Sequence, residues 1–157
     1  MRSTLFLAWS LALLFVSCNQ KYPEGALLIS TGDSTYGTDI LTISEKINKS
    51  PFEANKYYLR GNTFFFQDKF KLAIKDFLTA IKLEPKNPLY RYRAAETYLQ
   101  EDSANYLGAL EQIDEAIDLK QDYHEAILLK SKLLLARQQY QKCDPLLIKL
   151  SKIKDFK

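Results

Sequence analysis

Few residues of this chain are of types that carry out catalysis or hold a metal ion. There is one histidine, His124, and there are two cysteines, Cys18 and Cys143. The sequence has no CxxC, HExxH or GxSxG pattern and no phosphate-binding glycine loop, the spacings that metal, acyl-transfer and nucleotide chemistry use. The acidic pairs Glu101-Asp102 and Asp114-Glu115 fall on expected turns or helix faces, where solvated charges are ordinary. The sequence therefore predicts no catalytic residue, no metal site and no cofactor.

Composition indicates which kind of fold must position the remaining side chains. The chain has 157 residues, enough for one domain, and its glycines and prolines number five each, few for a many-stranded β fold. Its second half is rich in Lys, Leu, Ala, Ile and Glu, which favour helix. The formal net charge is +3 and no run of Lys and Arg stands out, so nucleic acid is not an expected partner. We expect an all-α protein.

The first 17 residues have the composition of a secretory signal peptide. Arg2 precedes an apolar run from Leu5 to Val16, interrupted only by Ser10. A membrane-spanning helix needs about 20 apolar residues, so this run of 12 is too short to span a bilayer. We therefore expect residues 1–17 to be removed from the mature protein.

The residues that follow, Phe15-Val16-Ser17-Cys18, resemble the lipobox of bacterial lipoproteins, with Phe15 where Leu is usual. This resemblance implies cleavage before Cys18 and acylation of its sulfur and amine. An ordinary signal peptide with an incidental cysteine is the alternative. Asn19 in place of Asp, and the absence of an acidic run after it, imply an outer-membrane lipid anchor on the periplasmic side.

Residues 18–38 are predicted to be the lipidated N-terminus and a flexible tether, since Gly25, Gly32 and Gly37 lie among Ser and Thr. Within it, residues 26–29 are apolar. A short strand and docking on the domain both remain open for them.

A 34-residue period runs through the rest of the chain, relating Pro51 to Pro85, Gly61 to Ala95 and Phe64 to Tyr98. It resembles the tetratricopeptide repeat, a helix–turn–helix unit with large and small residues at set positions. The matching residues are Tyr57, Gly61, Phe64, Phe70, Ala73, Phe77, Ala80 and Pro85, followed by Ala95, Tyr98, Ala109 and Ala116. The resemblance implies an α-solenoid of about seven antiparallel helices.

The repeat divides residues 39–157 into a lead helix at 39–49 and repeats at about 54–87, 88–123 and 124–157. Small residues at Gly61 and Ala73 are expected where the two helices of a repeat cross. The second repeat needs two extra residues in its turn. The third repeat departs most, with Cys143 in place of Ala and Pro145, which predicts that the last helix begins late.

The resemblance also implies a concave groove, lined by the first helix of each repeat, that holds a protein or peptide. The residues at its lining positions are Asn55, Tyr58, Asn62, Phe65, Leu89, Tyr92, Glu96, Leu99, Glu125, Leu128, Lys132 and Leu135. Tyr58 and Leu128 are not basic, so the clamp with which some members bind a terminal carboxylate is missing. Coverage of the groove by the tether or by the last helix is the alternative.

The leading hypothesis is a membrane-tethered adaptor without enzymatic activity. A second hypothesis is self-association through the C-terminal end, where Leu146, Leu147, Leu150 and Ile153 would be uncovered. A truncated member of a longer array also fits the sequence. Turnover lost on substitution of His124 or Cys143 would favour an enzyme.

Overall fold

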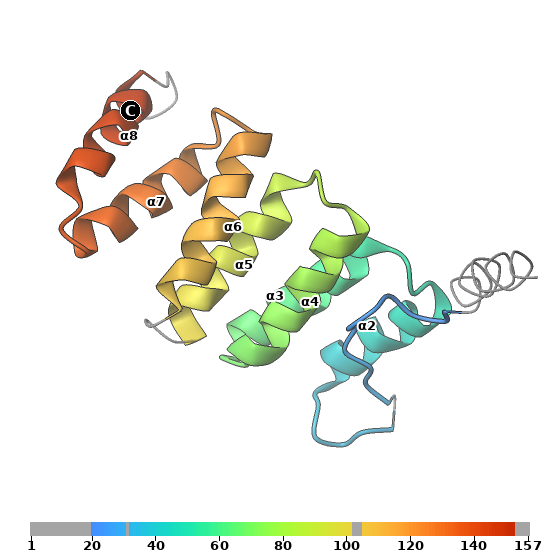
Figure 1. Ribbon diagram of the computed structural model, residues 1–157. Helices are drawn as coiled ribbons and strands as arrows, with labels where there is room; N and C mark the ends of the chain where they lie inside the picture. The colour runs from blue at the N-terminus through green and yellow to red at the C-terminus, as the bar shows by residue number, and fades with distance from the viewer. Residues whose placement is uncertain (1–19, 31, 102–104, 153–157) are drawn as a thin grey trace, which may run out of the picture.

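The computed structural model describes residues 20–30, 32–101 and 105–152, and this part of the chain forms seven α-helices and no strand (Figure 1). The helices are α2 (Thr38–Lys49), α3 (Ala54–Phe66), α4 (Phe70–Leu83), α5 (Pro88–Glu101), α6 (Tyr106–Leu119), α7 (His124–Ala136) and α8 (Tyr140–Ser151). Each helix packs against the next along the chain, and the successive hairpins stack into an elongated array (Figure 1). The expected all-α solenoid of helix–turn–helix repeats is confirmed.

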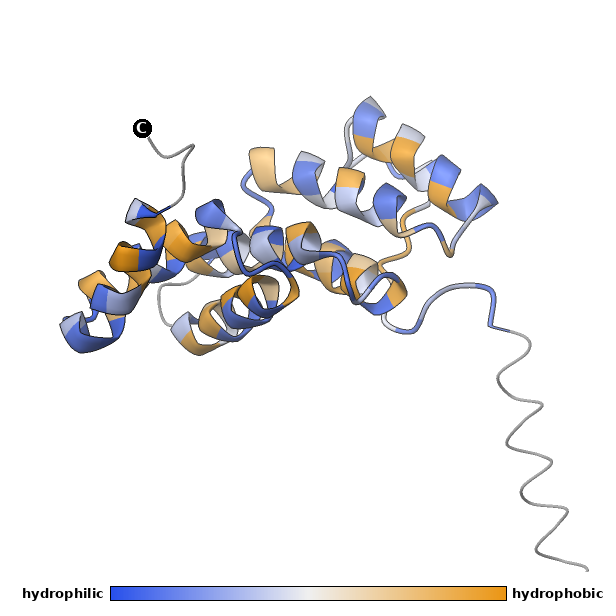
Figure 2. Ribbon diagram, turned by 90° about the horizontal axis from the view of Figure 1, so that it is seen from above, coloured by the Kyte–Doolittle hydropathy of each residue, from blue (hydrophilic) through white to orange (hydrophobic). Residues whose placement is uncertain are grey.

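The helices form because apolar residues recur every three or four positions, so that hydrophobic and hydrophilic residues alternate along them (Figure 2). In α4 an apolar stripe holds Ala73, Phe77 and Ala80, which are fully buried, whereas Lys75 and Lys82 are exposed. Burial of such a stripe between neighbouring helices supplies most of the stability of helices of this length.

The helix starts follow the 34-residue period. Helices α3, α5 and α7 begin at Ala54, Pro88 and His124, the first residues of the three predicted repeats. Helix α4 begins 16 residues after α3 does, whereas α6 begins 18 residues after α5 does. One of the two additional residues lengthens α5 relative to α3, and the other lengthens the connection to α6 from three residues to four.

Small residues lie where the helices approach most closely. A Cβ atom added to Gly61 would be 2.8 Å from Cε1 of Phe77, so α3 and α4 can only be this close with glycine at that point. The alanines at the repeat positions are all fully buried: Ala73, Ala80, Ala95, Ala109 and Ala116. Tyr57, Phe64 and Phe77 are also fully buried, while Phe70 is partly buried and packs edge-on against Phe65. The consecutive phenylalanines separate as helix geometry requires, with Phe66 77% exposed.

Residues 20–30, which we call the N-terminal strap, pack on the first helices instead of forming the predicted flexible tether. Ile29 is 6% exposed within the core formed by α2, α3 and α4. The Tyr22 hydroxyl donates to Oδ1 of Asn48 (3.2 Å), and Nζ of Lys82 donates to the Glu24 carbonyl (3.1 Å). Of the two alternatives for residues 26–29, docking is therefore the observed one, and no strand forms there.

A buried ion pair joins the strap to three helices. Arg60 (α3) is 1% exposed and Asp76 (α4) is 0% exposed. Arg60 Nε and Nη2 donate to the two carboxylate oxygens of Asp76, at 2.7 and 2.8 Å. Arg60 Nη1 donates to Oγ of Ser44 in α2 (2.9 Å), and Nη2 also donates to the Leu27 carbonyl in the strap (2.7 Å). Four of the five N–H groups of this buried arginine therefore donate to these acceptors.

The last helix does not begin late, so that prediction is wrong. Helix α8 begins at Tyr140 and contains Pro145. Cys143 is fully buried and its backbone N–H bonds to the Gln139 carbonyl, which closes the first turn before the proline. The N–H that proline lacks would have bonded the Gln141 carbonyl, and Gln141 is exposed, so water can replace that bond.

The close approach at Gly61 predicts opposite effects for two glycine substitutions. Gly61→Ala should destabilise the protein by about 1–2 kcal/mol, because overpacking against the buried Phe77 ring outweighs the gain in helix propensity. Gly108→Ala meets only the Asn105 side chain, which can move, so we expect a change between zero and a gain of about 1 kcal/mol. Denaturant unfolding measures both, and equal effects would contradict the close approach.

The buried ion pair predicts a large cost when one partner is removed. Asp76→Ala should lower the free energy of unfolding by about 3–5 kcal/mol, because it leaves the Arg60 charge buried without its carboxylate. Lys71→Ala is the control, since it removes a 3.8 Å pair with Glu101 whose lysine is 83% exposed, and it should cost less than about 1 kcal/mol. Urea titration of both variants checks this, and a loss below about 1 kcal/mol for Asp76→Ala would contradict it.

Candidate protein-binding face

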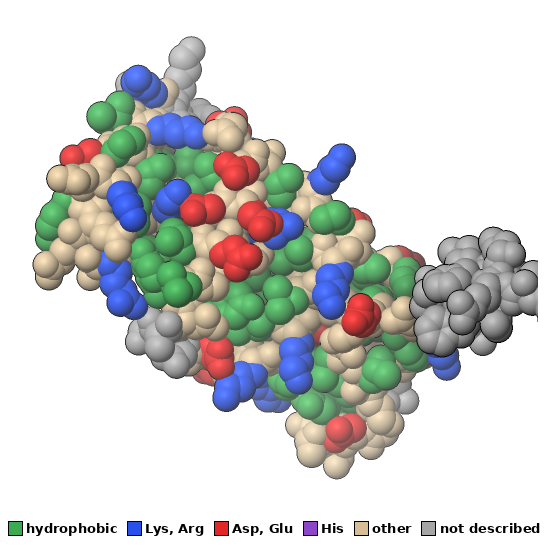
Figure 3. Space-filling model, viewed as in Figure 1, with side chains coloured by type: hydrophobic (Ala, Val, Ile, Leu, Met, Phe, Trp, Pro, Cys, Tyr) green, Lys and Arg blue, Asp and Glu red, His purple; other side chains and the backbone are tan. Residues whose placement is uncertain are grey.

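The predicted groove residues lie on the first helix of each hairpin, and we call them the A-helix face. On α3, Asn55 is exposed while Tyr58, Asn62 and Phe65 are partly buried. On α5, Leu89 is 37% exposed while Tyr92, Glu96 and Leu99 are partly buried. On α7, Leu128 is partly buried while Glu125, Lys132 and Leu135 are exposed. The opposite side of the array, formed by α4 and α6, has acidic and basic side chains interspersed among apolar ones (Figure 3).

Arg93 of α5 links the α3 and α5 parts of the A-helix face. Its Nε donates to Oδ1 of Asn62 (2.9 Å), and its Nη1 donates to Oε2 of Glu96 (2.6 Å). The guanidinium carbon also lies 4.6 Å from the centre of the Phe65 ring, a cation–π distance. The Arg93 side chain is 16% exposed, so these contacts are largely shielded from water. Three predicted groove residues are therefore held in place by one arginine.

Tyrosine rings extend this network toward α7. The Tyr92 hydroxyl donates to Oε1 of Glu96 (2.8 Å), and the Tyr92 ring lies 5.4 Å from that of Tyr123, just before α7. On the other side, the Tyr58 ring lies 5.2 Å from that of Tyr90. Burial raises the pKa of Tyr92, and Glu96 raises it further, while burial and nearby carboxylates raise the pKa of Tyr123 to about 12. Both phenols therefore stay neutral near pH 7.

The Arg93 contact also orients the Asn62 amide. Arginine only donates hydrogen bonds, so the Asn62 atom that faces Arg93 must be its oxygen. The Asn62 NH₂ group then points away from Arg93, on a side chain that is partly exposed. A fixed amide donor on a partly exposed helix face suits the carbonyl oxygen of a bound chain.

Sequence reasoning missed three members of this network, Tyr90, Arg93 and Tyr123. Tyr90 and Arg93 each follow a predicted position, Leu89 or Tyr92, by one residue, and Tyr123 precedes α7 by one. Only the stacking of the hairpins reveals their contacts. Conversely, the structure does not connect Glu125 and Lys132 to the network, whereas Leu128 packs in the same apolar cluster as Tyr92.

Among the described residues, His124 and Cys143 are the histidine and the cysteine, and His124 borders the A-helix face at Glu125. His124 is the first residue of α7, and its Nε2 is 4.0 Å from the Glu125 carboxylate. Cys143 is a free, fully buried thiol whose Sγ lies 3.6 Å from the Ser131 carbonyl, so it fills the place of an alanine. Cys18, Asp102 and Ile153 lie outside the described residues.

Metal-binding clusters and membrane-spanning helices are both absent from the described residues. No three or more His, Cys, Asp or Glu side chains among them are grouped so as to hold a metal ion. No helix among them has the length and apolarity needed to cross a bilayer.

The comparison with known families matches the hairpin that carries Asn62. The sequence profile of the tetratricopeptide repeat matches residues 54–87, the same bounds as the predicted first repeat. Residues 54–87 are a tetratricopeptide repeat. The chain is also similar to the Hsp70-Hsp90 organising protein of Plasmodium falciparum (isolate 3D7), with 29% identity over 91 residues. That match covers 57% of this chain but 16% of the longer relative, so the chain spans a small part of that protein's length.

The Arg93 network predicts that Arg93 contributes to stability more than other cations of the A-helix face. Arg93→Ala should cost about 1–2 kcal/mol, because it removes the bonds to Asn62 and Glu96 and the stacking on Phe65. Lys132→Ala is the control, since Lys132 is exposed and has no ion pair within the described part of the chain, and it should change stability by less than about 0.5 kcal/mol. Thermal unfolding compares them, and equal shifts in Tm would contradict the network.

Proposed function

We propose that this protein is an adaptor that binds a segment of another protein along its A-helix face and catalyses no reaction. The observation that carries this proposal is the Arg93 network, which fixes aromatic rings and an amide donor on one side of stacked repeats. Rings held in place bury apolar surface on binding without a large loss of side-chain entropy. The amide supplies a directional contact to the backbone of the bound segment.

The chemistry of the face favours an internal segment with apolar side chains over a terminal carboxylate. Phe66, Leu59 and Leu89 are 77%, 47% and 37% exposed, so apolar area is available beside the Asn62 amide. Tyr58 and Leu128, at the positions where a carboxylate clamp needs cations, are partly buried and uncharged. The name of the Plasmodium relative connects that protein with Hsp70 and Hsp90, and the lack of these cations argues against a shared mode of binding here.

We further propose that the adaptor is a bacterial lipoprotein, anchored through Cys18 to the periplasmic side of the outer membrane. The support for this is the resemblance of residues 15–18 to a lipobox and the presence of Asn19 after it. Two or more acyl chains hold a protein stably on a bilayer. The partner would then be another envelope protein.

Site-specific photo-crosslinking tests the adaptor proposal. We expect p-benzoylphenylalanine in place of Asn55, exposed on α3, to capture a discrete partner in the native envelope. The same amino acid in place of Lys75, exposed on α4 on the opposite side, should not. In the protein that carries the crosslinking amino acid at position 55, Arg93→Ala should lower the yield of the crosslinked partner several-fold. The reason is that Asn62 and Phe65 lose their contacts with Arg93.

Three results would contradict the adaptor proposal. These are equal capture from both positions, capture that is unaffected by Arg93→Ala, and crosslinks from Asn55 only within the chain. The last result would mean that the face is occupied by the protein itself. The hydrogen bonds of the strap go to Asn48, Arg60 and Lys82, none of which belongs to the A-helix face.

Self-association through the C-terminal hairpin is the second candidate, and one observation favours it. Phe77 and Ile113 occupy the same repeat position and are both fully buried, each in an apolar cluster that includes residues of the first helix of the next repeat. Leu147 occupies that position in the third repeat and is 42% exposed, next to Ile148 at 56%. Concentration-dependent mass that Leu147→Lys abolishes would support pairing of copies, and a monomer at all concentrations would exclude it.

A further inference from the structure

The point where the strap meets the array limits how far the domain can stand from a membrane. The Tyr22 hydroxyl is bonded to Asn48 near the end of α2, and the strap stays packed from there to Ile29. Cys18 lies four positions before Tyr22, and four extended residues span at most about 14 Å. An acyl chain on Cys18 would therefore lie close to the α2–α3 end of the array, with no long spacer between them.

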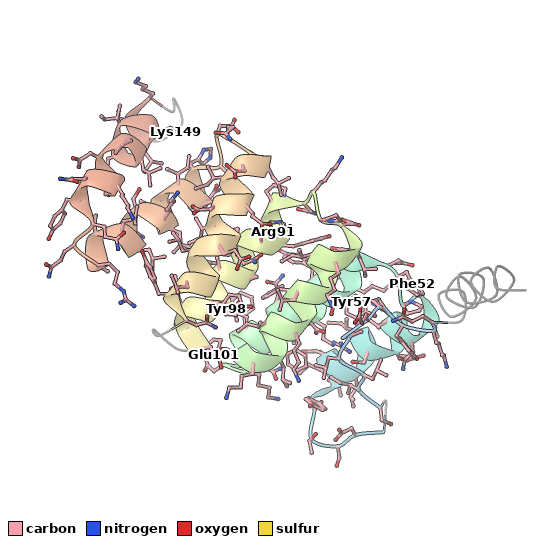
Figure 4. All side chains as sticks on the ribbon, in the orientation of Figure 1. Phe52, Tyr57, Arg91, Tyr98, Glu101 and Lys149 are labelled. Carbon is pink, nitrogen blue, oxygen red and sulfur yellow. The ribbon has the colours of Figure 1, made fainter. Side chains whose placement is uncertain are left out.

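That end of the array has an exposed aromatic side chain with no place in the core. Phe52 lies in the turn between α2 and α3 and is 56% exposed. It belongs to neither of the two apolar clusters of the described residues. Figure 4 shows Phe52 at the end of the array where the described chain begins, with Lys149 of α8 at the opposite end. Packing within the protein does not explain this phenylalanine.

Charged side chains around Phe52 are mixed, with a small excess of lysine. Glu45 pairs with Lys49 (2.8 Å) and Glu53 pairs with Lys56 (3.0 Å). The Lys49 side chain is 72% exposed, and Lys46 is exposed beside it. Aromatic rings and lysines flanking them are typical of side chains at the level of lipid headgroups. Since the acidic residues offset most of the positive charge, the apolar ring is the main attraction and the lipid charge matters little.

We propose that the α2–α3 end of the array is a membrane-contacting surface, with Phe52 seated in the interfacial layer of the bilayer. This inference rests on the proposed lipid anchor at Cys18. The anchor brings the surface to the bilayer, and the docked strap determines which end of the array arrives there. The array then projects from the membrane with α8 outermost, and the A-helix face stands free along its side.

Tryptophan quenching in vesicles tests the proposal on the full, lipidated protein. Trp9 is the only tryptophan of the sequence and lies in the predicted signal peptide, so a new tryptophan is the only one in the mature chain. The two variants are Phe52→Trp and Tyr140→Trp, the second at a position 57% exposed at the start of α8. The vesicles contain phosphatidylethanolamine and phosphatidylglycerol, with bromine on the acyl chains.

Brominated lipid should quench the emission of Phe52→Trp by at least about one half and leave that of Tyr140→Trp unchanged. Equal quenching of the two variants, or none at position 52 in protein that floats with the vesicles, would overturn the orientation while leaving the anchor in place. Failure of the wild-type protein to float, as expected of Cys18→Ser, would overturn the anchor and the orientation together. Neither failure bears on the partner captured from Asn55.

Discussion

The arrangement of the strap, α2 and the first helical hairpin, α3–α4, depends on one buried charge pair. Arg60 and Asp76 come from facing helices, and their fork-to-fork geometry satisfies both carboxylate oxygens. Burial raises the pKa of Asp76 to about 6, whereas its bonds to Arg60 and the arginine charge act to lower it. Two further N–H groups of the guanidinium donate to Ser44 in α2 and to the Leu27 carbonyl, so one side chain links two helices and the strap to α3. An apolar pair of side chains would fill the same space, but it would not fix the relative position of the helices through paired charges.

Apolar packing between successive helices continues the same arrangement along the rest of the array. Gly61 allows α3 and α4 to meet, and the buried alanines allow the later helices to follow at similar spacing. Two apolar clusters result, one around the strap and α2–α4 and one around α6–α8, with α5 contributing to both. The two ends of the array differ in the part of the chain that packs on them. The strap packs on the helices at the N-terminal end and leaves Phe52 exposed there, while Leu147 and Ile148 are exposed at the other end.

The A-helix face combines a rigid base with accessible apolar area, and this combination suits binding better than catalysis. Arg93 and Glu96 neutralise each other, so the proposed partner would be held by shape and apolar contact more than by net charge. The tyrosines remain protonated near neutral pH and act only as hydrogen-bonding groups. Anchoring at the α2–α3 end would leave this face accessible to proteins of the same compartment.

The sequence by itself determined the helices and their repeat, because spacing of large and small residues is a local property that a 34-residue period makes visible. Helices α3, α5 and α7 begin at the residues the period indicates. Other features depended on contacts between residues distant in the chain. The glycines near the strap suggested flexibility, yet Arg60 needs an acceptor that Leu27 supplies from 33 residues away. Likewise, Arg93 reaches Asn62 across 31 residues, and Pro145 is tolerated inside α8 because its turn faces water. Only the tertiary structure decides such features, since the partner that satisfies a buried charge has no fixed spacing in sequence.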